Sequence, residues 1–67
     1  MDKILSTQNI QASLQREGLT QAALAKQLGV SAQAITNWLK GVDFPRPDKL
    51  LKLAVLLKLS FDQLVEQ

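Results

Sequence analysis

The chain has 67 residues, a length that allows one domain with a modest core. Its formal net charge of +2 and sequence pI near 9.3 favour polyanionic partners but do not prove one. It contains no cysteine and no histidine, so disulfides, thiolate metal sites and the usual neutral general base are excluded. We therefore expect no enzyme activity, no metal and no cofactor. No apolar run has the length of a membrane helix and no signal-peptide core precedes the domain, so the expected location is cytoplasmic.

Apolar residues recur at helical spacing, which predicts a compact all-α domain of five short helices in which strands are not expected. The expected helices run from about Lys3 to Glu17, from a Thr20 cap to Leu28, from a Ser31 cap to Lys40, from an Asp48 cap to Leu57, and from Ser60 through Val65. Gly18, Gly29 and Gly41 follow the first three helices, at positions where glycine ends a helix without a Cβ clash. Ser60 and Gln63 fit a capping box at the start of the last helix.

The stretch from Leu19 to Gly41 predicts two short helices that cross closely after a tight turn. The crossing needs a small residue at the contact, which is Ala25, and a glycine four residues later, which is Gly29. Ile35 and Trp38, three apart, then direct bulky apolar groups back at the first helix of the pair. This pattern indicates a helix-turn-helix, whose second helix enters the major groove of DNA.

The chain also resembles a known family. The segment Leu-Thr-Gln-x-x-Leu-Ala-x-x-Leu-Gly-Val-Ser-x-x-x-Ile-x-x-Trp, followed by Gly41, is similar to the Cro/C1-type (XRE-like) helix-turn-helix domain of phage and bacterial repressors. The resemblance covers nearly all of the chain from Ile10 onwards. It implies a five-helix bundle of the lambda-repressor-like type that binds double-stranded DNA sequence-specifically, most simply as a transcriptional repressor. Ala23 departs from the family, in which several members have a glutamate there, so the cap of the second helix is weaker by ~0.5 kcal/mol.

The third helix carries the candidate DNA-reading residues. Because Ile35 and Trp38 fix its buried side, the opposite side presents Ala32, Gln33, Thr36, Asn37 and Lys40. Gln33 and Asn37, four apart, share one ridge, and each amide can pair with an adenine edge. Thr36 can offer its hydroxyl to a base or its methyl group to thymine. The alternative is that this face is an ordinary solvated helix surface.

The resemblance assigns roles to individual positions. It implies base or nearby phosphate contacts by Ser31, Ala32, Gln33, Thr36 and Asn37. Gln21 matches a glutamine that grips phosphate and braces the base-reading side chain. Lys40 and the loop Val42–Pro47 match a phosphate-contacting corner in which Arg46 is a candidate clamp, although plain solvation is an equal alternative for these two bases. The stems of Lys49, Lys52 and Lys58 are expected to shield the fourth helix rather than to bind DNA.

The fourth helix is more apolar than one buried face requires. Leu51 and Val55 lie four apart on a neighbouring face and Leu56 faces another direction. Either these residues form an exposed patch that pairs two copies, or the first and fifth helices cover them. We expect a weak homodimer, because one module buries only ~600–1,000 Å² on DNA and two copies ~34 Å apart read a palindrome.

Two further questions stay open at the level of sequence. The alternative function is a protein-interaction or antitoxin-type module that uses the apolar last two helices. We treat residues 1–67 as a single helix-turn-helix domain. Such a domain is either a minimal regulator or the N-terminal part of a longer one, with a fused or separate effector domain.

Overall fold

The computed structural model describes residues 4–66 and contains five helices and one small sheet in that range. In chain order the elements are β1 (Ile4–Leu5), α1 (Thr7–Glu17), α2 (Gln21–Leu28), α3 (Ala32–Lys40), α4 (Pro47–Leu57), α5 (Phe61–Leu64) and β2 (Val65–Glu66). The five helices confirm the predicted all-α architecture. None of the helices within residues 4–66 has the length and apolar character needed to cross a membrane.

Polar side chains fix the starts of α2, α3 and α5, as predicted. The Thr20 hydroxyl oxygen accepts the backbone N–H three residues on at 3.0 Å, and the Ser31 hydroxyl oxygen does the same at 3.1 Å. At α5 the capping box is complete, because Ser60 and Gln63 each accept the other's backbone N–H. Each of these bonds satisfies a backbone donor that has no partner inside its helix.

The start of α4 differs from the prediction. Asp48 does not cap the helix; Arg46 occupies the cap position without a side-chain cap bond, and Pro47 is the first helical residue. Proline suits this position because its φ is already helical and its missing N–H would be unpaired there anyway. Pro47 therefore belongs to α4 rather than to the loop Val42–Pro47. Asp48 lies in the first turn, where its negative charge is stabilised by the positive end of the helix dipole.

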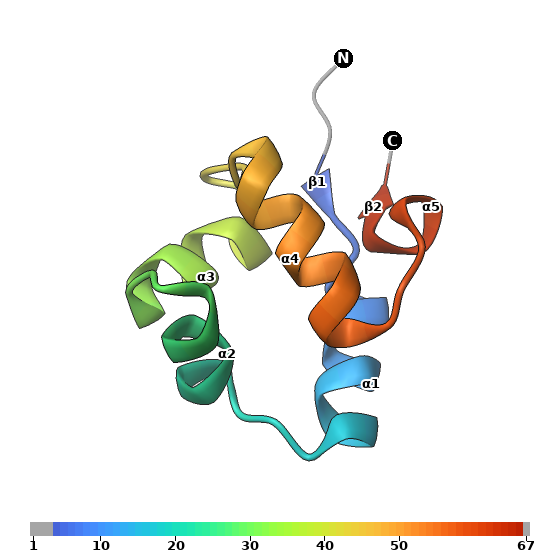
Figure 1. Ribbon diagram of the computed structural model, residues 1–67. Helices are drawn as coiled ribbons and strands as arrows, with labels where there is room; N and C mark the ends of the chain where they lie inside the picture. Colours follow the sequence, from blue (N-terminus) through green and yellow to red (C-terminus); the bar gives the residue numbers. More distant parts are fainter. Residues whose placement is uncertain (1–3, 67) are drawn as a thin grey trace.

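The two ends of the described chain meet in a short antiparallel sheet that was not expected. Helix α1 begins at Thr7 rather than near Lys3, which lies outside the described residues. The residues before it form β1, in which Leu5 pairs with Val65 of β2. Figure 1 shows the two strands side by side near the chain termini. Leu5 and Val65 are both buried, so the pair closes one end of the core. The prediction that the last helix includes Val65 is wrong, because Val65 belongs to β2.

Helix α4 runs across the molecule, with α2 and α3 on one side and α1, α5 and the strands on the other (Figure 1). Ala25, Ile35 and Trp38 are buried, which confirms the predicted scaffold of the α2–α3 crossing. Gly29 between these helices adopts the left-handed conformation with φ of 72°, where a side chain would be strained. The rest of the apolar core consists of Leu5, Ile10, Leu14, Leu24, Leu28, Leu50, Leu53, Leu57, Leu64 and Val65.

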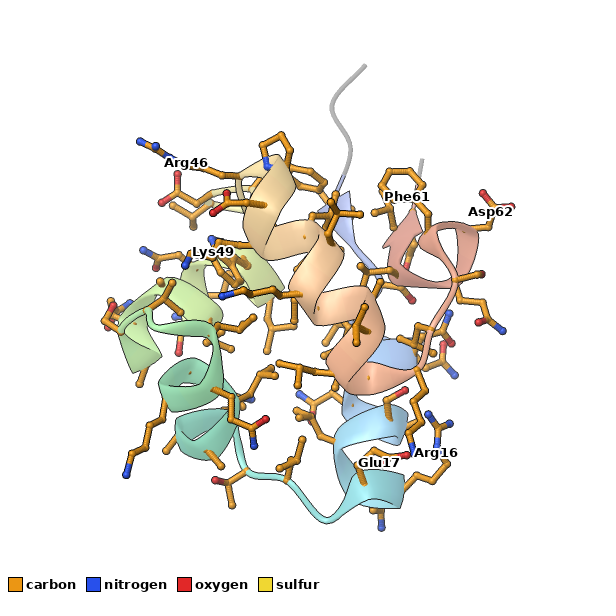
Figure 2. All side chains as sticks on the ribbon, in the orientation of Figure 1. Arg16, Glu17, Arg46, Lys49, Phe61 and Asp62 are labelled. Atoms are coloured by element: carbon orange, nitrogen blue, oxygen red, sulfur yellow. The ribbon has the colours of Figure 1, made fainter. Side chains whose placement is uncertain are left out.

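A polar cluster ties the C-terminal ends of α1 and α4 together. The Arg16 guanidinium donates to the Leu57 carbonyl oxygen at 2.9 Å. Glu17 lies 3.3 Å from Arg16 and 3.4 Å from the Lys58 ammonium, and these partners, Arg16 first, lower the pKa of the Glu17 carboxyl. Figure 2 shows Arg16 and Glu17 together, far from Arg46 at the opposite end of the molecule.

Candidate nucleic-acid interface

Helix α3 presents one solvent-facing polar side, opposite its buried side. Ile35 and Trp38 point into the core, and Ala34 and Leu39 pack partly against it, so the polar positions lie on the opposite side. Of the five predicted reading residues on this helix, three are exposed and two are half-buried, and all lie on that outer side: Ala32, Gln33, Thr36, Asn37 and Lys40. The helix therefore brings these five side chains together on a single face.

Two hydrogen bonds organise this face before any ligand binds. The Gln33 side-chain amide (Nε2) donates to the Asn37 side-chain oxygen (Oδ1) at 3.0 Å, across one helical turn. The bond uses one N–H of Gln33 and leaves its second N–H and its Oε1 for a ligand. The Thr36 hydroxyl donates to the Ala32 carbonyl oxygen at 3.2 Å, so its hydroxyl oxygen and its methyl group remain for other contacts.

The charge around this face is positive or neutral along α2 and α3. No acidic residue occurs between Gly18 and Val42. Lys40 is exposed in the last turn of α3, and Arg46 is exposed at the cap position of α4 and projects away from the body of the molecule (Figure 2). The exposed Asp43 and Asp48 lie near Arg46 in the chain, so this corner is mixed in charge, whereas α3 itself is free of acids.

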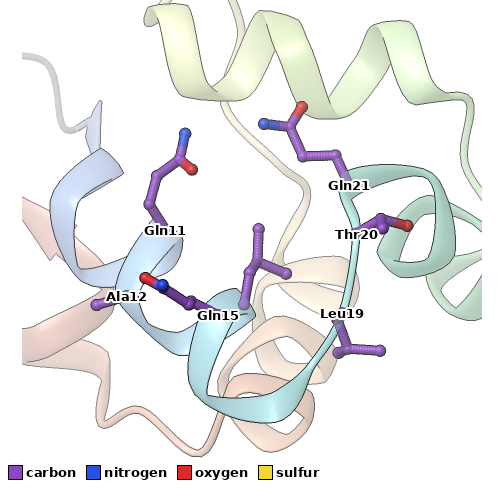
Figure 3. Close-up of a pocket in the computed structure, with 7 residues that line it drawn as sticks. Gln11, Ala12, Gln15, Leu19, Thr20 and Gln21 are labelled. Atoms are coloured by element: carbon purple, nitrogen blue, oxygen red, sulfur yellow. The ribbon is translucent and has the colours of Figure 1, made fainter.

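Gln21 lies at the start of α2 beside a shallow hollow. It is half-buried, and Figure 3 shows it on one side of the hollow with Gln11 and Gln15 of α1 on the other. The remaining lining residues are Ala12, Leu14, Leu19 and Thr20. Gln11 and Gln15 were not predicted as part of the site, because they belong to no motif and only the packing of α1 brings them near Gln21.

Ser31 caps α3 and is exposed, so its hydroxyl oxygen already accepts one backbone N–H. The backbone N–H groups of the first turn point towards this end of the helix. A helix N-terminus of this kind favours an anionic group such as a phosphate.

Lys49 contacts the helix-turn-helix formed by α2 and α3 in a way that was not predicted. Its ammonium donates to the carbonyl oxygen of Leu28, the last residue of α2, at 2.9 Å. The same nitrogen lies 3.9 Å from the position that a Cβ on Gly29 would occupy. Lys49 therefore connects α4 to the turn between α2 and α3, in addition to any shielding by its stem. A contact across 21 residues of sequence leaves no signal in local spacing.

Comparisons with known proteins agree with this geometry. Residues 10–64 match the family model described as helix-turn-helix. The solved structure of "a putative DNA-binding protein from Bacteroides fragilis" superposes with a TM-score of 0.76 at 29% identity, covering 97% of this chain and 100% of that one. The DNA-binding domain of the P22 C2 repressor superposes with a TM-score of 0.72 at 35% identity, covering 92% of this chain and 82% of that one. None of the curated proteins matches significantly.

The family match and the fold are those of DNA-binding transcription regulators, which are not enzymes. Within this class the chain belongs to the helix-turn-helix family of the Cro/C1 type. Both findings confirm the expectations drawn from the sequence.

Proposed function

We propose that the protein binds specific sequences of double-stranded DNA by placing α3 in the major groove, and that it represses transcription by occupying a promoter. The observation that carries this proposal is the solvent-facing side of α3, which is polar, free of acids and organised by the bond between Gln33 and Asn37. The absence of acids is the property that suits a polyanionic ligand, because an ordinary solvated helix surface is polar as well.

The amide of Gln33 supports a preference for adenine. With one N–H held by Asn37, the remaining N–H can donate to adenine N7 while Oε1 accepts from the adenine N6 amino group. Guanine offers two acceptors at the same edge, so Oε1 would face an acceptor there. In this scheme Asn37 orients Gln33, and Ala32 or the methyl group of Thr36 contacts a thymine methyl group.

The phosphate contacts lie around this reading face. Gln21 and Ser31 stand at the N-terminal ends of α2 and α3, where backbone N–H groups favour an anion. Lys40 and Arg46 are exposed at the other end of α3 and beyond it. Contacts at both ends would fix the register of α3 on the duplex without reading sequence themselves.

A single copy gives limited affinity, so we propose that the functional unit on DNA is a homodimer. One module of this size buries only ~600–1,000 Å² on DNA. Two copies related by a twofold axis would read two half-sites about one helical turn, ~34 Å, apart. The expected operator is therefore a palindrome.

Selection from a pool of random duplexes by the purified protein tests the proposal. The expected result is an enriched palindromic site with half-sites spaced by about one helical turn. A promoter that carries this site should be silenced in a reporter assay when the protein is present. If the selection enriches no sequence, the proposal is wrong and the alternative of a protein-interaction module is favoured.

A further inference from the structure

Helix α4 carries an outward apolar face that the rest of the described chain leaves uncovered. Leu51 is 70% exposed and Val55 is 76% exposed, so within residues 4–66 neither α1 nor α5 covers them. A groove lies on each side of the ridge that these two residues form. One groove is lined by Pro47, Leu50, Leu51, Ala54 and Phe61, and the other by Gln27, Leu51, Lys52, Val55 and Leu56. The arrangement provides both a ridge and the grooves into which the ridge of a second helix could pack.

Two opposite charges stand at the ends of this ridge. Asp48 precedes Leu51 by three residues, and Lys58 follows Val55 by three, so the four residues are spaced 3, 4 and 3 apart. Asp48, Leu51 and Val55 have the spacing of one side of a helix, and Lys58 follows as the C-cap of α4, in the left-handed conformation with φ of 57°. Asp48 is exposed, and 71% of the Lys58 side chain is exposed. We call the set Asp48, Leu51, Val55 and Lys58 the α4 seam.

We propose that two copies of this chain associate through their α4 seams, with the two helices antiparallel about a twofold axis between Leu51 and Val55. The order of the seam is acid, apolar, apolar, base, and reversing it on an antiparallel partner places Asp48 opposite Lys58 of the partner and Leu51 opposite Val55. The seam is thus complementary to itself in both charge and hydrophobicity. An interface about a twofold axis needs this property, because the same surface appears on both sides.

The other charges near the seam are compatible with this pairing. The Lys58 ammonium already lies 3.4 Å from Glu17, and it has three donors, so it can serve Glu17 and the partner's acid together. Lys52 stands beside the seam, where its stem can extend along the groove while its ammonium stays in water. A parallel arrangement would instead place like charges side by side.

The α4 seam supplies the contact surface and the register for the proposed homodimer. Its consequence for palindromic DNA rests on the proposed function, but the contact itself is measurable without DNA. Loss of dimerisation with intact DNA binding, or the reverse, would therefore tell which of the two proposals fails.

Sedimentation equilibrium of the purified chain, without DNA, is the first measurement. The wild type is expected to dimerise, and Val55→Glu, which places two acids in the apolar centre, to be monomeric while its far-UV circular dichroism stays unchanged. A wild type that remains monomeric up to about 1 mM would overturn the proposal, and so would a Val55→Glu variant that dimerises as the wild type does.

A charge exchange then tests the register. In a homodimer, Asp48→Lys alone creates two lysine–lysine pairs, and Lys58→Asp alone creates two aspartate–aspartate pairs. Each variant should therefore dimerise about tenfold or more weakly than the wild type. Mixing the two variants restores both opposite pairs, so a heterodimer of wild-type affinity is expected. Glu66→Lys, a charge reversal at an exposed acid outside the seam, should leave dimerisation unchanged. The antiparallel register is wrong if the mixture dimerises no better than its components.

Discussion

Lys40 is an exposed base at the end of the proposed reading helix, and its role on DNA should be purely electrostatic. Replacing it with alanine is expected to weaken binding to all sequences alike, because phosphate contacts carry no base information. The slope of the logarithm of the binding constant against the logarithm of salt concentration should become less negative by about one for each copy bound, and so by about two for the proposed homodimer. Titrations at several salt concentrations measure this slope. Lys52→Ala, on α4, is the matched control, and an equal slope change in both variants would contradict the assignment.

Lys49 holds α4 to the end of α2 through its bond to the Leu28 carbonyl oxygen. Lys49→Met keeps most of the stem and removes the bond, so the free energy of unfolding should fall by about 1 kcal/mol. Urea denaturation measures the loss, with Lys52→Met on the exposed side of the same helix as the control. Equal stability of both variants and the wild type would show that the bond contributes nothing.

At the scale of residues, the predictable part of the site was the part fixed by helical phase. Ile35 and Trp38 are bulky enough to determine which side of α3 is buried, and the outer side follows from them. The bond of Lys49 to the Leu28 carbonyl oxygen was missed for a different reason. It depends on packing between elements that are distant in sequence, and spacing within one helix contains no such information.

At the scale of elements, α2 depends on one polar cap. The Thr20 hydroxyl oxygen accepts the Ala23 N–H at 3.0 Å, but Ala23 cannot return a bond as Gln63 does in α5. Thr20→Ala should therefore lower the free energy of unfolding by about 1 kcal/mol, since no second bond supports this helix start. Thermal or urea unfolding measures the change. Thr20→Ser keeps the hydroxyl and should recover most of the loss; a loss as large as that of alanine would argue against the cap.

The boundaries of the elements were predictable where a signal was local. The caps of α2, α3 and α5 are read from a side chain and the N–H three residues later, and these predictions are confirmed. The start of α4 was misplaced because Asp48 competes with Pro47, whose fixed φ lets the helix begin two residues earlier than an Asp48 cap would. Two-residue strands have no periodicity to detect, so β1 and β2 exist only because the fold brings the two chain ends together.

At the scale of the whole molecule, the dimensions allow each copy to place one helix, α3, on the DNA. The Cα atoms extend over 32 × 21 × 19 Å, so the molecule is about as long as one helical turn of DNA, ~34 Å. A single copy can therefore place α3 in one segment of the major groove, and a longer site requires a second copy. The α4 seam is the surface that we propose for that second copy.

The proposed reading of bases by α3 depends on Gln33 more than on any other side chain. Selection from random duplexes should be repeated with Gln33→Ala, which removes the amide and leaves the helix and its charge unchanged. We expect a loss of about 1–3 kcal/mol for each half-site of the wild-type sequence, together with loss of the adenine preference at one base pair of each half-site and unchanged preferences elsewhere. An enriched site and an affinity identical to those of the wild type would contradict the placement of α3 in the major groove.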